Sequence, residues 1–127
     1  MIYTQSEKEK IELIMELFDD YIKSLPDYEI FYSDRLGYIW VVTAERADNM
    51  YFPIRSRDEL LCSLISYVLC DAEKEEGNIN TNQIYYWFAD RLMKHKDAYI
   101  DCAYLVNKQL SLWRDFRKIY FPEDPRV

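Results

Sequence analysis

The stretch of residues 60–70 constrains the fold most, because it carries no charged side chain over about three turns of helix. Ser56 followed by Glu59 forms a capping box that predicts where this helix begins, and Gly77 marks its end. The run is shorter than the about 20 apolar residues that a membrane-spanning helix needs. A helix with no charged side must be covered all round, so we expect this one at the centre of the core.

Another helix is predicted near the start of the chain. Ser6 and Glu9 form a capping box, and Pro26 ends the segment. Between them, large apolar side chains recur at helical spacing: Ile11, Ile14, Met15, Phe18, Tyr21, Ile22 and Leu25. The pattern predicts one continuous amphipathic helix.

A β-hairpin is predicted after that helix. Residues 28–32 are rich in β-branched and aromatic side chains, residues 33–37 have turn composition, and residues 38–44 return to the strand pattern. Residues 50–54 form a candidate third strand. Because Pro53 cannot donate to a hydrogen-bond ladder, that strand would lie at an edge of the sheet.

A third helix is predicted to begin at Asn80. Gln83 follows at the position of a capping-box partner, and Ile79 and Ile84 stand where a hydrophobic staple would place them. This helix is expected to run to about Lys94.

The last helix is predicted to be capped by Asp97 and ended by Pro122 and Pro125. Residues at helical spacing divide it into two faces. The apolar face holds Cys102, Leu105, Val106, Leu110, Trp113, Phe116 and Tyr120; the polar face holds Asn107, Lys108, Ser111, Arg114, Asp115 and Lys118.

These elements predict an α+β fold, in which a small antiparallel sheet packs with four helices in the order α-β-β-(β)-α-α-α. The sheet is a hairpin that a third strand can extend. We expect a single domain over residues 1–127, with flexible ends at residues 1–5 and 122–127.

The composition restricts the class of protein. The chain is 50% apolar and 17% aromatic, which argues against intrinsic disorder. Its net charge of −7 disfavours nucleic acid as a partner, because Lys and Arg supply most of that affinity. Charges come before any apolar stretch in residues 1–10, unlike a secretory signal, and Cys62, Cys70 and Cys102 cannot all pair. We expect a cytoplasmic protein with buried, reduced thiols and no membrane segment.

Motifs for catalysis, cofactors and metals are absent from the sequence. The only glycines, Gly37 and Gly77, stand too far apart to build a phosphate-binding loop. His95 is the single histidine, and the cysteine spacings do not match a zinc site. His95 and Cys102 are read as an exposed histidine and an inert thiol rather than as a catalytic pair. We expect no catalytic residues, no cofactor and no metal.

Acidic residues crowd the outer face of the first predicted helix. These are Glu12, Glu16, Asp19 and Asp20. One interpretation is an ordinary solvated helix face. The other is a docking site for a basic protein surface, with the chain acting as an acidic inhibitor or a mimic of nucleic acid.

Aromatic residues suggest two further candidate surfaces. Four consecutive aromatic side chains cannot all face one core, and Trp87 falls with Arg91 on the outer side of its helix, next to Tyr86. Trp87 either packs under a neighbouring segment with Arg91 stacked on its ring, or it marks an interface. In the second strand, Tyr38 and Trp40 occupy one face and Ile39 and Val41 the other, so both faces need cover.

These observations favour a small, non-enzymatic, cytoplasmic module for protein interaction or regulation, with a homodimer among the possible states. We expect a bacterial or mobile-element source. The alternative is a small-molecule-binding domain, or an enzyme of unfamiliar type, with a pocket lined by Tyr and Trp. A weaker alternative is the acidic inhibitor that binds through the first helix.

Overall fold

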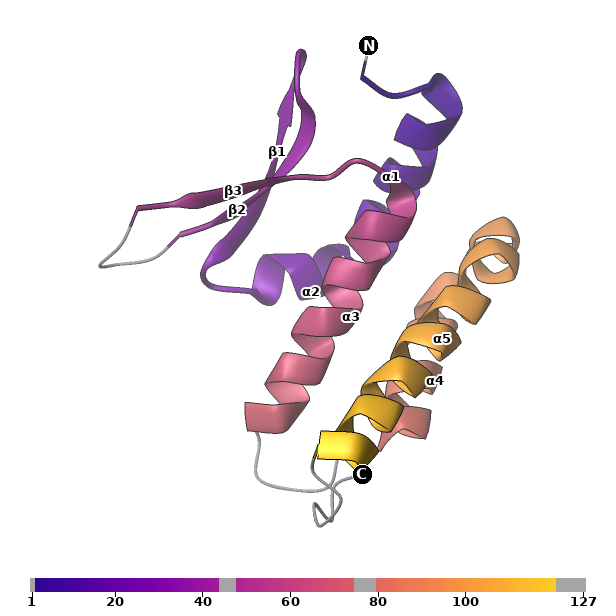
Figure 1. The fold of residues 1–127 in the computed structure, drawn as a ribbon. Coiled ribbons are helices and arrows are strands. Elements are labelled where there is room, and N and C mark those ends of the chain that lie inside the picture. The colour runs from indigo at the N-terminus through magenta and orange to yellow at the C-terminus, as the bar shows by residue number, and fades with distance from the viewer. Residues whose placement is uncertain (1, 44–47, 75–79, 121–127) are drawn as a thin grey trace. The chain divides into compact units, whose positions relative to one another are not determined.

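The computed structural model describes residues 2–43, 48–74 and 80–120, and within them the chain forms five helices and a three-stranded antiparallel sheet (Figure 1). The predicted α+β class and the order of sheet and helices are confirmed. The elements are α1 (Gln5–Leu17), α2 (Asp19–Ser24), β1 (Tyr28–Ser33), β2 (Gly37–Val42), β3 (Met50–Pro53), α3 (Arg57–Lys74), α4 (Thr81–Leu92) and α5 (Lys96–Tyr120).

The chain groups into two compact units, Met1–Leu60 and Leu61–Val127, which divide within α3. The first unit holds α1, α2, the sheet and the first turn of α3. The second holds the rest of α3 together with α4 and α5.

The first predicted helix begins earlier and is interrupted. Thr4 is the N-cap, and its side chain accepts a hydrogen bond from the Glu7 backbone N–H at 3.1 Å, so Ser6 lies inside the helix rather than at its cap. At Phe18 the backbone leaves the helical region (φ −115°, ψ 17°), and α2 continues in a new direction (Figure 1). Phe18 stays fully buried at the bend. The apolar spacing therefore runs across a break that the sequence pattern did not reveal.

The sheet has the order β1-β2-β3 with antiparallel neighbours. Gly37 closes the hairpin with φ 77°, a left-handed conformation that glycine adopts without steric cost. The predicted third strand is confirmed as an edge strand. Pro53 lies in it opposite Ile39, and the next residue, Ile54, donates its N–H to the Tyr38 carbonyl at 2.9 Å.

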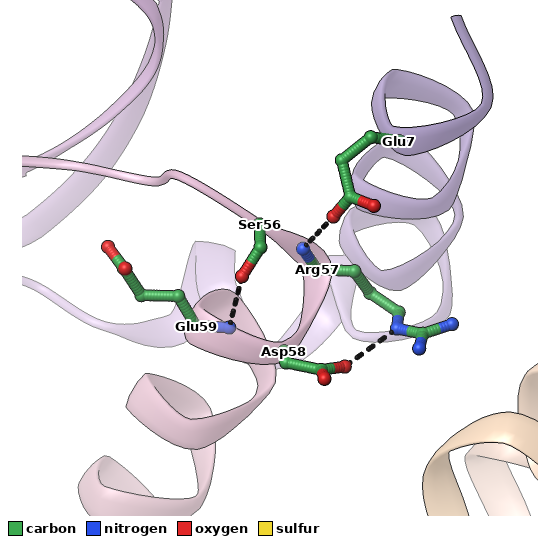
Figure 2. A network of polar contacts seen from close by, with 5 residues as sticks. All are labelled: Glu7, Ser56, Arg57, Asp58 and Glu59. Carbon is green, nitrogen blue, oxygen red and sulfur yellow. Dashed lines mark hydrogen bonds and ion pairs between the residues drawn. The ribbon is translucent and has the colours of Figure 1, made fainter. Parts of the chain in front are cut away.

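The start of α3 carries the predicted cap and a second contact from α1 (Figure 2). Ser56 Oγ accepts a hydrogen bond from the Glu59 backbone N–H at 3.1 Å. The Arg57 backbone N–H donates to the Glu7 carboxylate at 2.6 Å, which places a negative charge at the positive end of the α3 dipole. Glu7 thus ties α1 to α3 within the first unit.

The uncharged stretch of α3 is covered on one side only. Leu60, Leu61 and Leu64 are fully buried, whereas Ser66 and Cys70 are exposed. The expectation of cover all round was wrong, because an uncharged helix is not an apolar one. Small polar and thiol side chains can face water at little cost, so only the leucine stripe needs burial. The predicted end at Gly77 lies outside the described residues.

Of the last two helices, α4 has its predicted cap and α5 does not, because Asp97 lies in the first turn of α5 rather than at its cap. Asn80 Oδ1 accepts from the backbone N–H groups of Asn82 and Gln83 at 3.0 and 3.2 Å, which confirms the predicted N-cap of α4. Its staple partner Ile79 lies outside the described residues. α4 ends at Leu92, before the predicted Lys94, and α5 begins one residue before Asp97.

The buried face of α5 changes near its end. Cys102, Leu105, Val106 and Leu110 are buried as predicted, but Phe116 and Tyr120 are 51% and 64% exposed. The reason is length: α5 is about twice as long as α4, so its last turns extend beyond the start of α4. Arg117 is buried there instead.

Candidate functional site

One face of the sheet is contacted by α1 near Tyr38, although Met50 and Phe52 of β3 on the same face are 53% and 48% exposed. Tyr38 Oη donates to Glu12 Oε2 at 2.9 Å, and Lys8 Nζ lies 4.9 Å from the centre of the Tyr32 ring, so side chains of α1 contact this face at two points. Tyr38 and Trp40 are 9% and 3% exposed. The sequence had placed both on a candidate interaction surface, and the structure places both in the interior. The alternation alone could not tell which face α1 would cover.

The Tyr38 hydroxyl is held in its protonated form. Burial, with the hydrogen bond to Glu12 and its negative charge as the next causes, raises the pKa of Tyr38 to about 12. The neutral phenol is the form that can donate to the carboxylate. Glu12 therefore serves an internal contact rather than standing free on the helix surface.

A tyrosine before α1 joins two strands of the sheet. Tyr3 Oη accepts from the Tyr38 backbone N–H at 2.9 Å and donates to the Ile54 carbonyl, so its hydroxyl bridges this N–H and this carbonyl, while the Ile54 N–H bonds directly to the Tyr38 carbonyl. Burial also raises the pKa of Tyr3. Residues 1–5 were expected to be a flexible end, yet Tyr3 is buried. No local sequence signal identifies this contact, because its partners are 35 and 51 residues away.

Gly37 is required by the same contact. A Cβ at this position would lie 2.5 to 2.7 Å from three atoms of the Tyr3 side chain. Its positive φ is unfavourable for any other residue as well. The tight turn and the inserted tyrosine therefore depend on each other.

The opposite face of the sheet is partly open: its outer residues are exposed, whereas Val41 of the central strand β2 is 3% exposed. In the strand register Ile39 lies between Phe31 and Pro53, and Val41 lies beside Tyr51, so these side chains share one face. Phe31 is 49% exposed and Tyr51 is 64% exposed, Pro53 is exposed, and Ile39 is half-buried. We call Phe31, Ile39, Tyr51 and Pro53 the open sheet face. The sequence predicted that both faces of the hairpin need cover, and it named Tyr38 and Trp40 rather than these residues as the candidate surface.

The aromatic run of α4 resolves into separate roles. Arg91 stacks on Trp87, with its Cζ 4.1 Å from the ring centre, which covers part of the half-buried indole. The Tyr85 hydroxyl is hydrogen-bonded to Tyr99 of α5, and this bond raises the pKa of Tyr85. Tyr86 is 64% exposed. Of this candidate surface, Tyr86 alone is largely open to solvent.

The acidic residues of the first predicted helix do not form one continuous face. The break at Phe18 leaves Glu12 and Glu16 on α1 and puts Asp19 and Asp20 in the first turn of α2. Asp19 forms an exposed ion pair with Lys23 at 2.9 Å. The acidic docking surface is thus divided between two helices.

A polar cluster that the sequence did not indicate lies in the second unit. Glu73 Oε1 accepts from Trp113 Nε1 at 3.2 Å and pairs with Arg117 Nη2 at 2.8 Å. The Arg117 guanidinium also lies 5.4 Å from the centre of the Trp113 ring. Arg117 is 8% exposed. The cluster links α3 to α5, and Arg114 of α5 donates to Thr81 at the start of α4.

The cysteines differ from one another. All three are free thiols, and Cys102 is buried as expected, but Cys62 is half-buried and Cys70 is exposed. Among the residues that the structure describes, no three His, Cys, Asp or Glu side chains are grouped so as to hold a metal ion. In the same residues, no helix combines the length and the apolar composition needed to cross a membrane.

An isolated apolar stripe also runs along the exposed side of α5. It comprises Ile100, Tyr104, Leu112 and Ile119. We call it the α5 stripe, and it is the main alternative to the open sheet face as a contact surface.

Comparison with known proteins does not favour either surface: no family model, curated protein or solved structure matches this chain.

Proposed function

We propose that the protein is a non-enzymatic interaction or regulatory module that contacts a partner protein through its open sheet face. The observation that carries the proposal is that Phe31 and Tyr51 are 49% and 64% exposed on one face of the sheet, whereas Tyr38 and Trp40 at the centre of the other face are buried. Aromatic side chains are enriched at protein interfaces, and Tyr contributes large contact area at low entropic cost.

The chemistry of the open sheet face suits such a contact. The residues of the open sheet face carry no charge, and the charged residue next to them is Glu29, which the register places in one row with Val41 and Tyr51. Charged residues are depleted in the centres of interfaces, where water is excluded. An apolar patch on a rigid sheet also binds without first having to be ordered.

The other candidate surfaces support this role less well. Tyr38 and Trp40 are interior residues, and Trp87 is partly covered by Arg91. The acidic residues are divided between α1 and α2. The proposal places the protein in the cytoplasm, where three free thiols would stay reduced. The net charge of −7 favours a protein partner over nucleic acid.

The test compares two lysine substitutions at exposed apolar positions. Tyr51→Lys alters the open sheet face, and the matched control Ile119→Lys alters the α5 stripe, where Ile119 is 72% exposed. Each tagged variant is purified from its native host, and bound proteins are quantified by mass spectrometry against wild type. We expect a stoichiometric partner that wild type and Ile119→Lys retain and Tyr51→Lys loses. Equal recovery with Tyr51→Lys, or loss with Ile119→Lys alone, would refute the proposal.

A further inference from the structure

The backbone groups of β1 divide into those that bond to β2 and those that point away. The Thr43 N–H donates to the Asp27 carbonyl at 2.8 Å, which extends the β1–β2 ladder by one bonded pair. In an antiparallel ladder, bonded and non-bonded pairs alternate. The pairs of Glu29 with Val41 and Phe31 with Ile39 are then bonded. The main-chain N–H and C=O of Ile30 and Tyr32 therefore face away from β2, toward the free edge.

The other edge of the sheet, along β3, is protected. The Ile54 N–H donates to the Tyr38 carbonyl at 2.9 Å, so the same alternation makes Phe52 a bonded residue and leaves Tyr51 and Pro53 facing outward. Proline has no N–H to offer to another strand. Placing proline on an exposed edge is a common way to prevent edge-to-edge pairing.

The edge of β1 has no such protection. Its register with β2 is continuous, so no bulge interrupts it, and its residues include neither proline nor lysine. Within the part of the chain that the structure describes, no hydrogen bond reaches the outward main-chain groups of Ile30 or Tyr32. The side chains of Phe31 and Tyr32 on this strand are 49% and 43% exposed. Such an edge is a template for a further strand.

We propose that β1 pairs antiparallel with β1 of a second copy, across a two-fold axis at Phe31, to make a continuous six-stranded sheet. The inference rests on the proposed interaction function and goes beyond it, because it adds a second contact, along the edge of β1, whose partner is another copy of this chain. In this arrangement Ile30 of each copy lies opposite Tyr32 of the other. Their outward groups form four main-chain hydrogen bonds, two for each bonded pair.

The side chains of β1 select this register. With the axis at Phe31, the two Phe31 rings lie directly opposite on the open sheet face, in a non-bonded pair where side chains come closest. Glu29 then lies opposite Ser33 of the second copy, so the two acidic groups do not face each other. An axis at Ile30 would instead place each Phe31 opposite Glu29. The register at Phe31 also joins the two open sheet faces into one apolar surface.

The first test is the oligomeric state of the purified protein, measured by light scattering after size-exclusion chromatography. Tyr32→Pro removes the outward N–H, and Tyr32→Ala removes the same ring but keeps the N–H. We expect wild type and Tyr32→Ala to be dimers. Tyr32→Pro should raise the dimer dissociation constant on the order of 30-fold, because two hydrogen bonds of the interface are lost. A dimer that Tyr32→Pro leaves unchanged would overturn the inference.

The second test does not depend on whether Tyr32→Pro folds. Phe31→Cys places two thiols opposite each other on the axis, at a separation that a disulfide can bridge. Tyr51→Cys is the control: it lies on the same face, but five strand spacings, about 24 Å, would separate its two copies. Under mild oxidation we expect a covalent dimer for Phe31→Cys whose link joins residue 31 to residue 31, as peptide mapping identifies. Its absence would overturn the inference.

The failures of the two proposals are distinguishable. If wild type is monomeric and Tyr51→Lys loses the captured partner, self-pairing is overturned and the proposed function stays in place. If Phe31→Cys forms a dimer linked through residue 31 and Tyr51→Lys captures the same proteins as wild type, self-pairing is supported. The open sheet face is then refuted as the contact surface for another protein.

Discussion

The hydroxyl of Tyr3 provides the sharpest test of how the first unit is held together. Tyr3→Phe removes one oxygen atom and leaves the ring. That oxygen is the partner of two buried main-chain groups, the Tyr38 N–H and the Ile54 carbonyl. The three residues are 8%, 9% and 5% exposed, so water cannot readily replace it.

The expected cost follows from those two groups. Leaving a buried donor or acceptor unsatisfied costs about 1–3 kcal/mol, so two of them should lower the free energy of unfolding by about 2–6 kcal/mol. For a chain of this length the melting temperature should fall by roughly 10 °C. Thermal denaturation followed by circular dichroism measures the shift.

The matched control is Tyr120→Phe, which removes the same atom from a side chain that is 64% exposed. Substitutions at such positions change stability by no more than about 0.5 kcal/mol. Amide hydrogen exchange at Tyr38 gives a second readout, because its N–H should lose protection in Tyr3→Phe. If Tyr3→Phe melts within about 2 °C of Tyr120→Phe and Tyr38 stays protected, the strands must close without the hydroxyl, and our reasoning would be wrong.

Three further predictions concern the same contacts and the second unit. Gly37→Ala should lower the free energy of unfolding by about 2–4 kcal/mol, because of the positive φ at this position and the clash with Tyr3. Chemical denaturation of the double mutant should show that the same substitution costs less in a Tyr3→Ala background. Because the pKa of Tyr38 is raised from 10 to about 12, its contribution to stability is complete below pH 10 and is lost as the pH rises toward 12. Chemical denaturation between pH 10 and pH 12 should show this decline in the free energy of unfolding. The decline should be smaller in Tyr38→Phe. Glu73→Ala should lower the free energy of unfolding, measured by urea denaturation, by about 2 kcal/mol, because it leaves the buried Arg117 without its ion pair while the Glu73 side chain is itself 35% exposed. Glu73→Gln keeps a hydrogen-bond acceptor and should lower it less. Equal losses for Glu73→Ala and Glu73→Gln would exclude a role for the retained acceptor.

The sequence by itself determined the type and order of the elements, apart from the break between α1 and α2, and it determined where α3 and α4 begin. Ser56 and Asn80 cap their helices as predicted, and Pro53 lies in an edge strand, because these signals act between residues a few positions apart. The alternation of Tyr38 and Trp40 with Ile39 and Val41 also showed correctly that β2 has two apolar faces.

Only the tertiary structure decided which faces are covered. Tyr38 and Trp40 are core residues on the side of the sheet that α1 contacts, whereas on the other side Phe31 and Tyr51 are at the surface and Val41 is buried. Phe116 is exposed because α5 is longer than the helix beside it, whereas Arg117 is buried in contact with Glu73 and Trp113. A residue's spacing fixes the side of its own element on which it lies. Whether that side is buried depends on contacts between distant segments, such as those of Tyr3, for which the local sequence carries no signal.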